Sequence, residues 1–382
     1  MSELNLLIIW EKGRDKEKII LDDMNKSFKI CQCIDMKWSD KHFHTNLSRF
    51  YGQKLPSGSH KQKHCGSGRF LIVTFIDESP EYDYRDTSRG PEYVNINVFD
   101  RKALYREWTG GGHKIHATNG KHETSHDLML LLGKCAKQYT NDYSGKCEIE
   151  AMSTIFMDRD LEGSKGWRDF KHMFSTINSC AQYVVMRNFD SLPNDYRVND
   201  HGDIDFLTTN KVDFAFILNA KKSKRIFRSA AYEILVNDEF VPCDLREIGD
   251  GYYDRTWQEN ILDNSVMNGV FSIPSKEDFF PMLSYHALIH KVKISDDYQN
   301  HFNQENMTIN SVFEFTESFM KERSYLITIP KDISVYLNRS NVDMLNVDVE
   351  KCSTIGYIVR LIRQLVLVDF RLRLGKLKRM VI

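Results

Sequence analysis

The sequence of 382 residues predicts mixed α/β and α+β architecture, with an N-terminal α/β domain followed by a mixed-sheet domain that ends in helices. Strand-like and helix-like segments alternate over the first 140 residues, which is typical of an α/β domain. Further along, short strand-like runs surround two closely spaced aspartates, Asp203 and Asp205, and helical spacing follows them. The length is more than one core usually requires, so we expect two domains and a tail.

The N-terminal segments differ in the periodicity of their apolar residues. The run at 69–76 is rich in β-branched and aromatic residues and predicts a buried central strand. In chain order we expect a strand at 4–10, a helix at 15–26, a strand at 28–34, a helix at 40–51 and the strand at 69–76.

Shifts in composition predict the domain boundaries. We expect the α/β domain at 1–140, a polar, glycine-containing linker at 141–165, the second domain at 166–350 and a basic amphipathic tail at 351–382.

Composition excludes several classes of protein. Hydrophobic residues make up 41% of the chain and charged residues 27%, as in ordinary globular proteins. The 52 basic residues are balanced by 53 acidic ones, so we expect no nucleic-acid partner. The eight cysteines contain no paired Cys-x-x-Cys motifs that would predict structural zinc. The apolar run at 4–10 is too short for a membrane span and lacks the features of a signal peptide, so we expect a cytoplasmic protein.

Three aspartates form the candidate active site. Asp203 and Asp205 are two residues apart, so in a strand their side chains point to the same face. Asp244 lies in a second strand-like segment, 240–248, which we expect to form a hairpin with 232–236. If the strands are adjacent, three carboxylates converge on a site that suits Mg²⁺ or Mn²⁺. The alternative is that the acids line a solvated strand face, although clustered carboxylates repel one another without a cation.

The order of segments in this region resembles a known family. This part of the chain resembles the nucleotidyltransferase fold of the DNA polymerase beta superfamily. The resemblance rests on a helix at about 166–180, a strand at 182–187, the sequence Gly202-Asp203-Ile204-Asp205 and a later strand with one more Asp. More narrowly, 183–193 together with 201–205 resembles nucleotidyltransferase-like proteins of bacterial surface-polysaccharide clusters. LicD and fukutin-type phosphotransferases, which move phosphocholine or alditol phosphate from a CDP carrier, are relatives at that level.

The resemblance implies that Asp203 and Asp205 bind the metal and that Asp244 completes its shell or acts as a base. It also implies a CDP-type nucleotide donor and a glycan or lipid-linked glycan acceptor. The chain departs from the family at 188–191, where Asn-Phe-Asp-Ser replaces the usual Gly-Ser turn. This departure argues against direct use of an NTP and leaves a diphosphate-linked donor or an atypical mode of phosphate binding as the options. It also motivates a non-catalytic nucleotide-binding module as an alternative, and nucleotidyl transfer to a small molecule is the nearest catalytic alternative.

Several cationic and aromatic residues are candidates for binding the substrate. Arg187 ends the strand before the acidic pair, and Lys221 and Lys222 begin a basic cluster that either binds phosphates or is a solvated turn. Tyr252, in a glycine-flanked loop after Asp244, either stacks on a base or sugar or belongs to a plain turn. The predicted helix at 278–293 has His286 and His290 on one face and Lys291 and Lys293 near its end. Either one of these cations reaches a phosphate or the histidines belong to the core.

A second candidate binding loop follows three consecutive glycines, 110–112. Gly111, Gly112, His113 and Lys114 can present N–H groups and a cation to phosphate, with His113 or His116 as the proton carrier. A flexible turn between domains is the alternative. Nearby, the pair His122 and His126 has the spacing of metal ligands on a helix, although helix capping explains most of the segment.

The tail at 351–382 carries basic residues among apolar ones. No apolar stretch in it is long enough to span a bilayer. Such a helix either lies on a membrane surface, which would place the protein at the inner face of the membrane, or packs on the core with a basic outer side.

Overall fold

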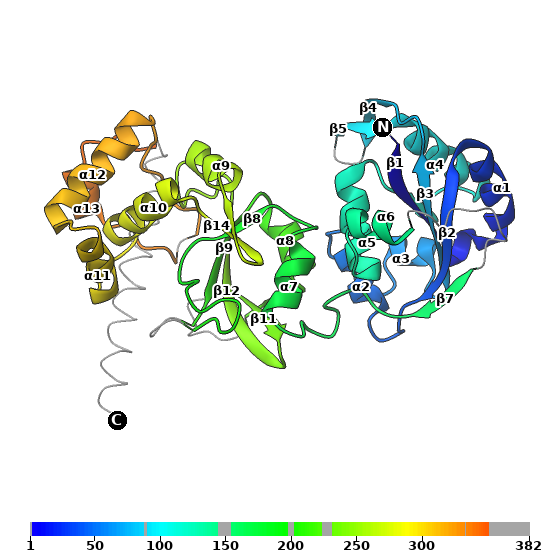
Figure 1. Ribbon diagram of the computed structural model, residues 1–382, viewed down its shortest axis with the longest axis horizontal. Coiled ribbons are helices and arrows are strands. Elements are labelled where there is room, and N and C mark those ends of the chain that lie inside the picture. The colour runs from blue at the N-terminus through cyan, green and yellow to red at the C-terminus, as the bar shows by residue number, and fades with distance from the viewer. Residues whose placement is uncertain are drawn as a thin grey trace. The chain divides into compact units, whose positions relative to one another are not determined.

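A computed structural model describes residues 2–87, 90–143, 154–197, 202–223, 231–332 and 334–350 (Figure 1). These residues form a mixed α/β structure with two five-stranded sheets, as the sequence predicts. No helix within these ranges has the length and apolar character needed to cross a membrane. The predicted basic tail at 351–382 lies outside the described residues.

The first sheet has the strand order β6-β1-β3-β2-β7. β3 is central, as predicted, and pairs antiparallel with both β1 and β2, while β2 pairs parallel with β7. Its strands are β1 (Glu3–Ile9), β2 (Lys29–Lys37), β3 (Phe70–Asp77), β6 (Ile115–Ala117) and β7 (Ile155–Asp158). β7 lies inside the predicted linker, because the short apolar run Ile155-Phe156-Met157 extends this sheet.

Helices cover both faces of the first sheet. Alternate residues of each strand enter opposite cores, because side chains along a strand point to opposite faces. Leu6 and Ile8 pack with α2 (Phe43–Phe50), α5 (Lys121–Leu132) and α6 (Ala136–Tyr143). Leu7 and Ile9 pack with α1 (Glu17–Ser27) and α4 (Ile96–Trp108). Also in this region are η1 (Glu11–Lys16), α3 (His60–Cys65) and the hairpin of β4 (Tyr82–Thr87) and β5 (Gly90–Asn95).

The second sheet has the order β10-β11-β12-β9-β8. β8 and β9 are antiparallel, whereas β9 and β12 are parallel. β11 and β12 are joined through Asn237 and Asp238, both of which have the positive φ expected of a two-residue hairpin loop. The strands are β8 (Tyr183–Val185), β9 (Ile204–Thr208), β10 (Lys221–Lys222), β11 (Tyr232–Val236) and β12 (Glu239–Glu247).

Helices before, between and after these strands complete the described chain. A large apolar core joins β8 and β9 to the later helices α9, α10 and α12, around Trp257 and Tyr285. The elements are α7 (Phe170–Ile177), α8 (Lys211–Ile217), α9 (Arg255–Asp263), β13 (Val266–Asn268), β14 (Phe271–Ile273), α10 (Lys276–Ile289), α11 (Asp296–Gln304), α12 (Ile309–Glu322) and α13 (Arg339–Met344).

Contacts divide the chain into two compact units, each built from two segments. The first comprises Met1–Gln182 and Val212–Pro242, and the second comprises Tyr183–Lys211 and Cys243–Ile382. The chain passes between the units within β12, at Pro242 and Cys243. This division does not follow the boundaries predicted at 140 and 166, which stay a prediction.

The hairpin loop between β11 and β12 generates a test of stability. Asp238 is exposed and has φ 60°, a conformation that glycine adopts without strain. We expect Asp238→Gly to raise the free energy of unfolding by about 0.5 kcal/mol and Asp238→Val to lower it by about 1–2 kcal/mol. Urea denaturation measures both values. A valine variant as stable as the parent would contradict this loop conformation.

Candidate metal centre

The pairing of β9 with β12 brings the predicted acidic residues together. The two strands run parallel, and Asp205 lies directly opposite Asp244 in their register. Opposed residues of parallel strands point to the same face, so the two carboxylates are neighbours. Asp203 immediately precedes β9 and is two residues from Asp205. The structure thus joins all three residues that the sequence selected.

The three carboxylates are close enough to share one ion. One oxygen from each of Asp203, Asp205 and Asp244 lies within 4.8 Å of the other two. Asp205 is 2% exposed, whereas Asp203 and Asp244 are partly exposed, so the group reaches the protein surface. Oxygen ligands alone favour Mg²⁺ or Mn²⁺ over softer metals.

Two arginines pair with the acids, of which Arg246 is buried and Arg187 is partly buried. A guanidinium nitrogen of Arg187 lies 3.0 Å from Asp205 Oδ1, and one of Arg246 lies 3.4 Å from Asp244 Oδ2. Arg246 also pairs with Asp332 at 2.9 Å. The expectation that these carboxylates would be uncompensated without a metal is therefore wrong, because two guanidinium groups already offset part of their repulsion.

The residues nonetheless fit a divalent cation. Among the described residues, none forms an ion pair or hydrogen bond with the carboxylate of Asp203. The Oδ1 atom of Asp205 is buried and accepts no hydrogen bond from them, despite the nearby guanidinium of Arg187. Burial raises the pKa of Asp205, and Arg187 opposes this rise. A buried oxygen without a hydrogen bond is costly, so the site retains capacity for an ion.

Tyr252 supports this centre from the protein interior. Its hydroxyl accepts a hydrogen bond from Arg187 at 3.0 Å and lies 2.7 Å from His286 Nδ1. Arg246 lies over its ring, 4.6 Å from the centroid. The stacking of Tyr252 on a base or sugar stays a prediction; in this structure its side chain is 1% exposed and packs in the interior. Its ring and hydroxyl hold both arginines beside the acids.

A further cation, Lys291, lies two residues after the end of α10 at Ile289. Burial lowers the pKa of Lys291, as does Arg187, while Asp205 and Asp203 raise it. Burial also lowers the pKa of His286 well below its usual value, with Arg187 and Lys291 acting in the same direction. Lys291 therefore interacts electrostatically with the acids from the segment after α10, whereas the helix predicted at 278–293 ends at Ile289. His286 lies within α10 and supports the Tyr252 hydroxyl.

The remaining predicted residues belong to the other contact unit. Lys221 and Lys222 form β10 and are exposed. Gly111 and Gly112 have φ 81° and 79°, in the left-handed region that favours glycine. The roles predicted for these residues in binding phosphate stay predictions.

The cations after this glycine loop are engaged locally. Lys114 Nζ donates to Thr109 O at the end of α4. The backbone N–H of His113 donates to His64 Nδ1 at 3.3 Å, and burial together with Lys61 lowers the pKa of His113 to about 4. His116 is buried and hydrogen-bonded to Asp127. These contacts explain the local conformation without a ligand.

Sequence reasoning missed Arg246 and Asp332 as parts of the centre. Arg246 was detectable, because it lies two residues after Asp244 and therefore on the same face of β12. Asp332 lies in a later segment without regular structure, so no local pattern connects it to the strand.

A cavity of about 800 Å³ borders α10 and α12, and none of the three aspartates lines it.

Comparison with known proteins gives no match: no protein-family model, no curated protein and no solved structure matches this chain.

The geometry predicts that metal binding requires the partly exposed Asp203. We expect Asp203→Asn to raise the Kd for Mn²⁺ at least about tenfold, a loss of about 1.4 kcal/mol. The fold should persist, because this carboxylate has no partner among the described residues. Isothermal titration calorimetry measures the affinity, and Asp343→Asn, at an exposed position in α13, is the control. Equal losses in both variants would argue against the site.

Arg246 should compete with the ion for Asp244. We expect Arg246→Gln to lower the Kd for Mn²⁺, by about tenfold if the guanidinium and the ion exclude each other. Thermal unfolding should show a parallel loss of stability, since Asp332 also loses its partner. Arg255→Gln, which alters an exposed ion pair, is the matched control. Weaker Mn²⁺ binding in Arg246→Gln would contradict competition.

Proposed function

We propose that the protein is a metal-dependent phosphate-group transferase of bacterial cell-surface polysaccharide synthesis. It would transfer an alditol phosphate or similar group from a nucleotide-diphosphate donor to a glycan or lipid-linked glycan. We favour a CDP-type donor. The observation that carries the proposal is the meeting of Asp203, Asp205 and Asp244 within 4.8 Å on paired strands. The resemblance of residues 165–300 to the nucleotidyltransferase fold adds the type of chemistry.

Each residue of the centre has a role in this proposal. Asp203 and Asp205 would hold Mg²⁺ or Mn²⁺, with Asp244 as third ligand or as base toward the acceptor hydroxyl. The bound ion would supply positive charge to balance the transferring phosphate. Lys291, Arg187 and Arg246 would add fixed positive charge on the protein side.

The turn at 188–191, before the strand that carries Asp205, supports an atypical mode of phosphate binding. Asn188 occupies the place of the family's glycine and has φ 56°, in the left-handed region that glycine adopts most easily. Asparagine tolerates this conformation better than most residues. The turn can therefore retain a glycine-like backbone, although the family's Gly-Ser sequence is missing.

A non-catalytic nucleotide-binding module is the second candidate. The ion pairs of Arg187 with Asp205 and of Arg246 with Asp244 favour it, since they stabilise the acids without a metal. Nucleotidyl transfer to a small molecule is the nearest catalytic alternative, because it uses the same three acids.

The proposal also includes a location in the cell. A cytoplasmic enzyme acting on lipid-linked glycans would work at the inner face of the membrane. Basic residues of the tail at 351–382 would supply peripheral attraction to anionic lipid.

Substitution of the acids tests the catalytic proposal. We expect Asp203→Asn and Asp205→Asn to lower turnover with CDP-ribitol or CDP-glycerol by several orders of magnitude, while circular dichroism shows an unchanged fold. Asp343→Asn should retain full turnover. Full turnover in a purified, folded Asp203→Asn protein would count against this assignment.

Metal-dependent nucleotide binding separates the two candidates. Mn²⁺-dependent binding of CTP or CDP-ribitol without turnover of any donor would favour the binding module. Turnover that depends on Mn²⁺ would favour the transferase.

A further inference from the structure

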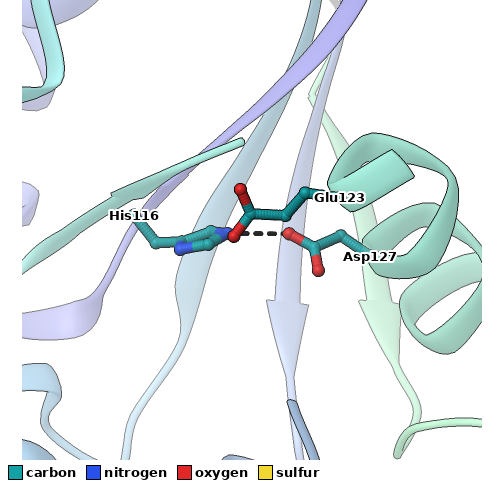
Figure 2. A group of neighbouring side chains, drawn as sticks. All are labelled: His116, Glu123 and Asp127. Atoms are coloured by element: carbon teal, nitrogen blue, oxygen red, sulfur yellow. Dashed lines mark hydrogen bonds and ion pairs between the residues drawn. The ribbon is translucent and has the colours of Figure 1, made fainter. Parts of the chain in front are cut away.

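The first contact unit contains a second group of potential metal ligands. His116 lies on β6, at the edge of the first sheet, and Glu123 and Asp127 lie on the first two turns of α5. Figure 2 shows the imidazole and the two carboxylates gathered between this strand and this helix. The chain is short between β6 and α5, so a few residues place all three groups together.

The three side chains have the spacing of a coordination shell. One ligand atom from each of His116, Glu123 and Asp127 lies within 4.8 Å of the other two. The closest pair is His116 Nε2 and Asp127 Oδ2, 2.7 Å apart. His116 is 8% exposed and Asp127 is 2% exposed, whereas Glu123 is half-buried. The group is therefore buried except on the side of Glu123.

Contacts from outside the group hold both carboxylates in place. The Oδ1 atom of Asp127 lies 2.9 Å from His126 Nδ1. The Oε2 atom of Glu123 accepts the backbone N–H of Asn119 at 2.6 Å. Each carboxylate thus has one oxygen held by a residue outside the group. Hydrogen bonds of this kind orient metal ligands and strengthen binding.

Aromatic packing fixes the imidazole. The His116 ring makes T-shaped contacts with Phe50 and Tyr51, with centroid distances of 5.1 and 5.7 Å. The hydroxyl of Tyr51 is itself fixed by the indole N–H of Trp10 at 3.0 Å. The ring therefore cannot turn away from Asp127 without disturbing this aromatic cluster, so all three ligands are preorganised.

We propose that His116, Glu123 and Asp127 form a divalent transition-metal site, of the Zn²⁺ class. One imidazole nitrogen with two carboxylate oxygens suits Zn²⁺, Co²⁺ or Mn²⁺ and is a poor match for Mg²⁺, which prefers oxygen alone. The ion would replace the hydrogen bond between His116 and Asp127. This site is separate from the centre in the second unit and does not depend on the proposed transferase function.

The test is Zn²⁺ titration of the full chain carrying Asp203→Asn, which weakens the other centre. We expect one Zn²⁺ per chain by calorimetry, and Glu123→Gln in this background should weaken it by roughly 100-fold. Glutamine can still accept the Asn119 N–H, so the helix start is preserved. Glu92→Gln is the matched control, because Glu92 also accepts a hydrogen bond from Asn119 but lies outside the group.

Nitrogen-15 NMR of histidine provides an independent readout. Zn²⁺ should shift one ring nitrogen of His116 in the otherwise unaltered protein, and the shift should be absent in Glu123→Gln. Equal Zn²⁺ affinity in Glu123→Gln and Glu92→Gln, or unshifted His116 nitrogens at saturating Zn²⁺, would overturn the proposal. The group would then be a hydrogen-bonded support of the core. Neither result depends on turnover, so the site can fail while the transferase proposal stands.

Discussion

The in-register pairing of β9 with β12 is the interaction on which the acidic centre depends. Burial sets that register: Val241, Cys243 and Leu245 alternate with more polar neighbours and turn toward the interior. A slip of one residue would bring these apolar side chains to the acidic face and send Asp244 to the opposite side. The hydrophobic effect on one face of the strand therefore positions the carboxylate on the other.

Positive charges within the centre offset part of the negative charge of the three clustered aspartates. Arg187 and Arg246 each pair with one aspartate, and Tyr252 contacts both guanidinium groups. The centre can therefore fold without a metal, and an ion must compete with groups already in place. Under the proposed transferase function, the same two guanidinium groups would also attract the donor phosphate, since arginine binds both carboxylate and phosphate.

Local patterns explain which features the sequence could predict. Continuous apolar runs located the central strand β3, and the two-residue period of a strand was enough to place Asp203 and Asp205 on one face. Strand order, the inclusion of β7 in the first sheet and the link from Arg246 to Asp332 depend on contacts between distant segments. The burial of Tyr252 was hidden for the same reason, because flanking glycines favour a turn whether its aromatic ring points inward or outward.

The interrupted course of the chain limits how it can be divided. Residues Val212–Pro242 belong by their contacts to the first unit, yet they lie between two strands of the acidic centre. A single cut therefore cannot release either unit whole. A fragment ending at Gln182 lacks Val212–Pro242 of the first unit, and a fragment beginning at Tyr183 contains Val212–Pro242 without the rest of that unit. Limited proteolysis or gene truncation would yield incomplete bodies, and evolutionary exchange of one unit would require two junctions.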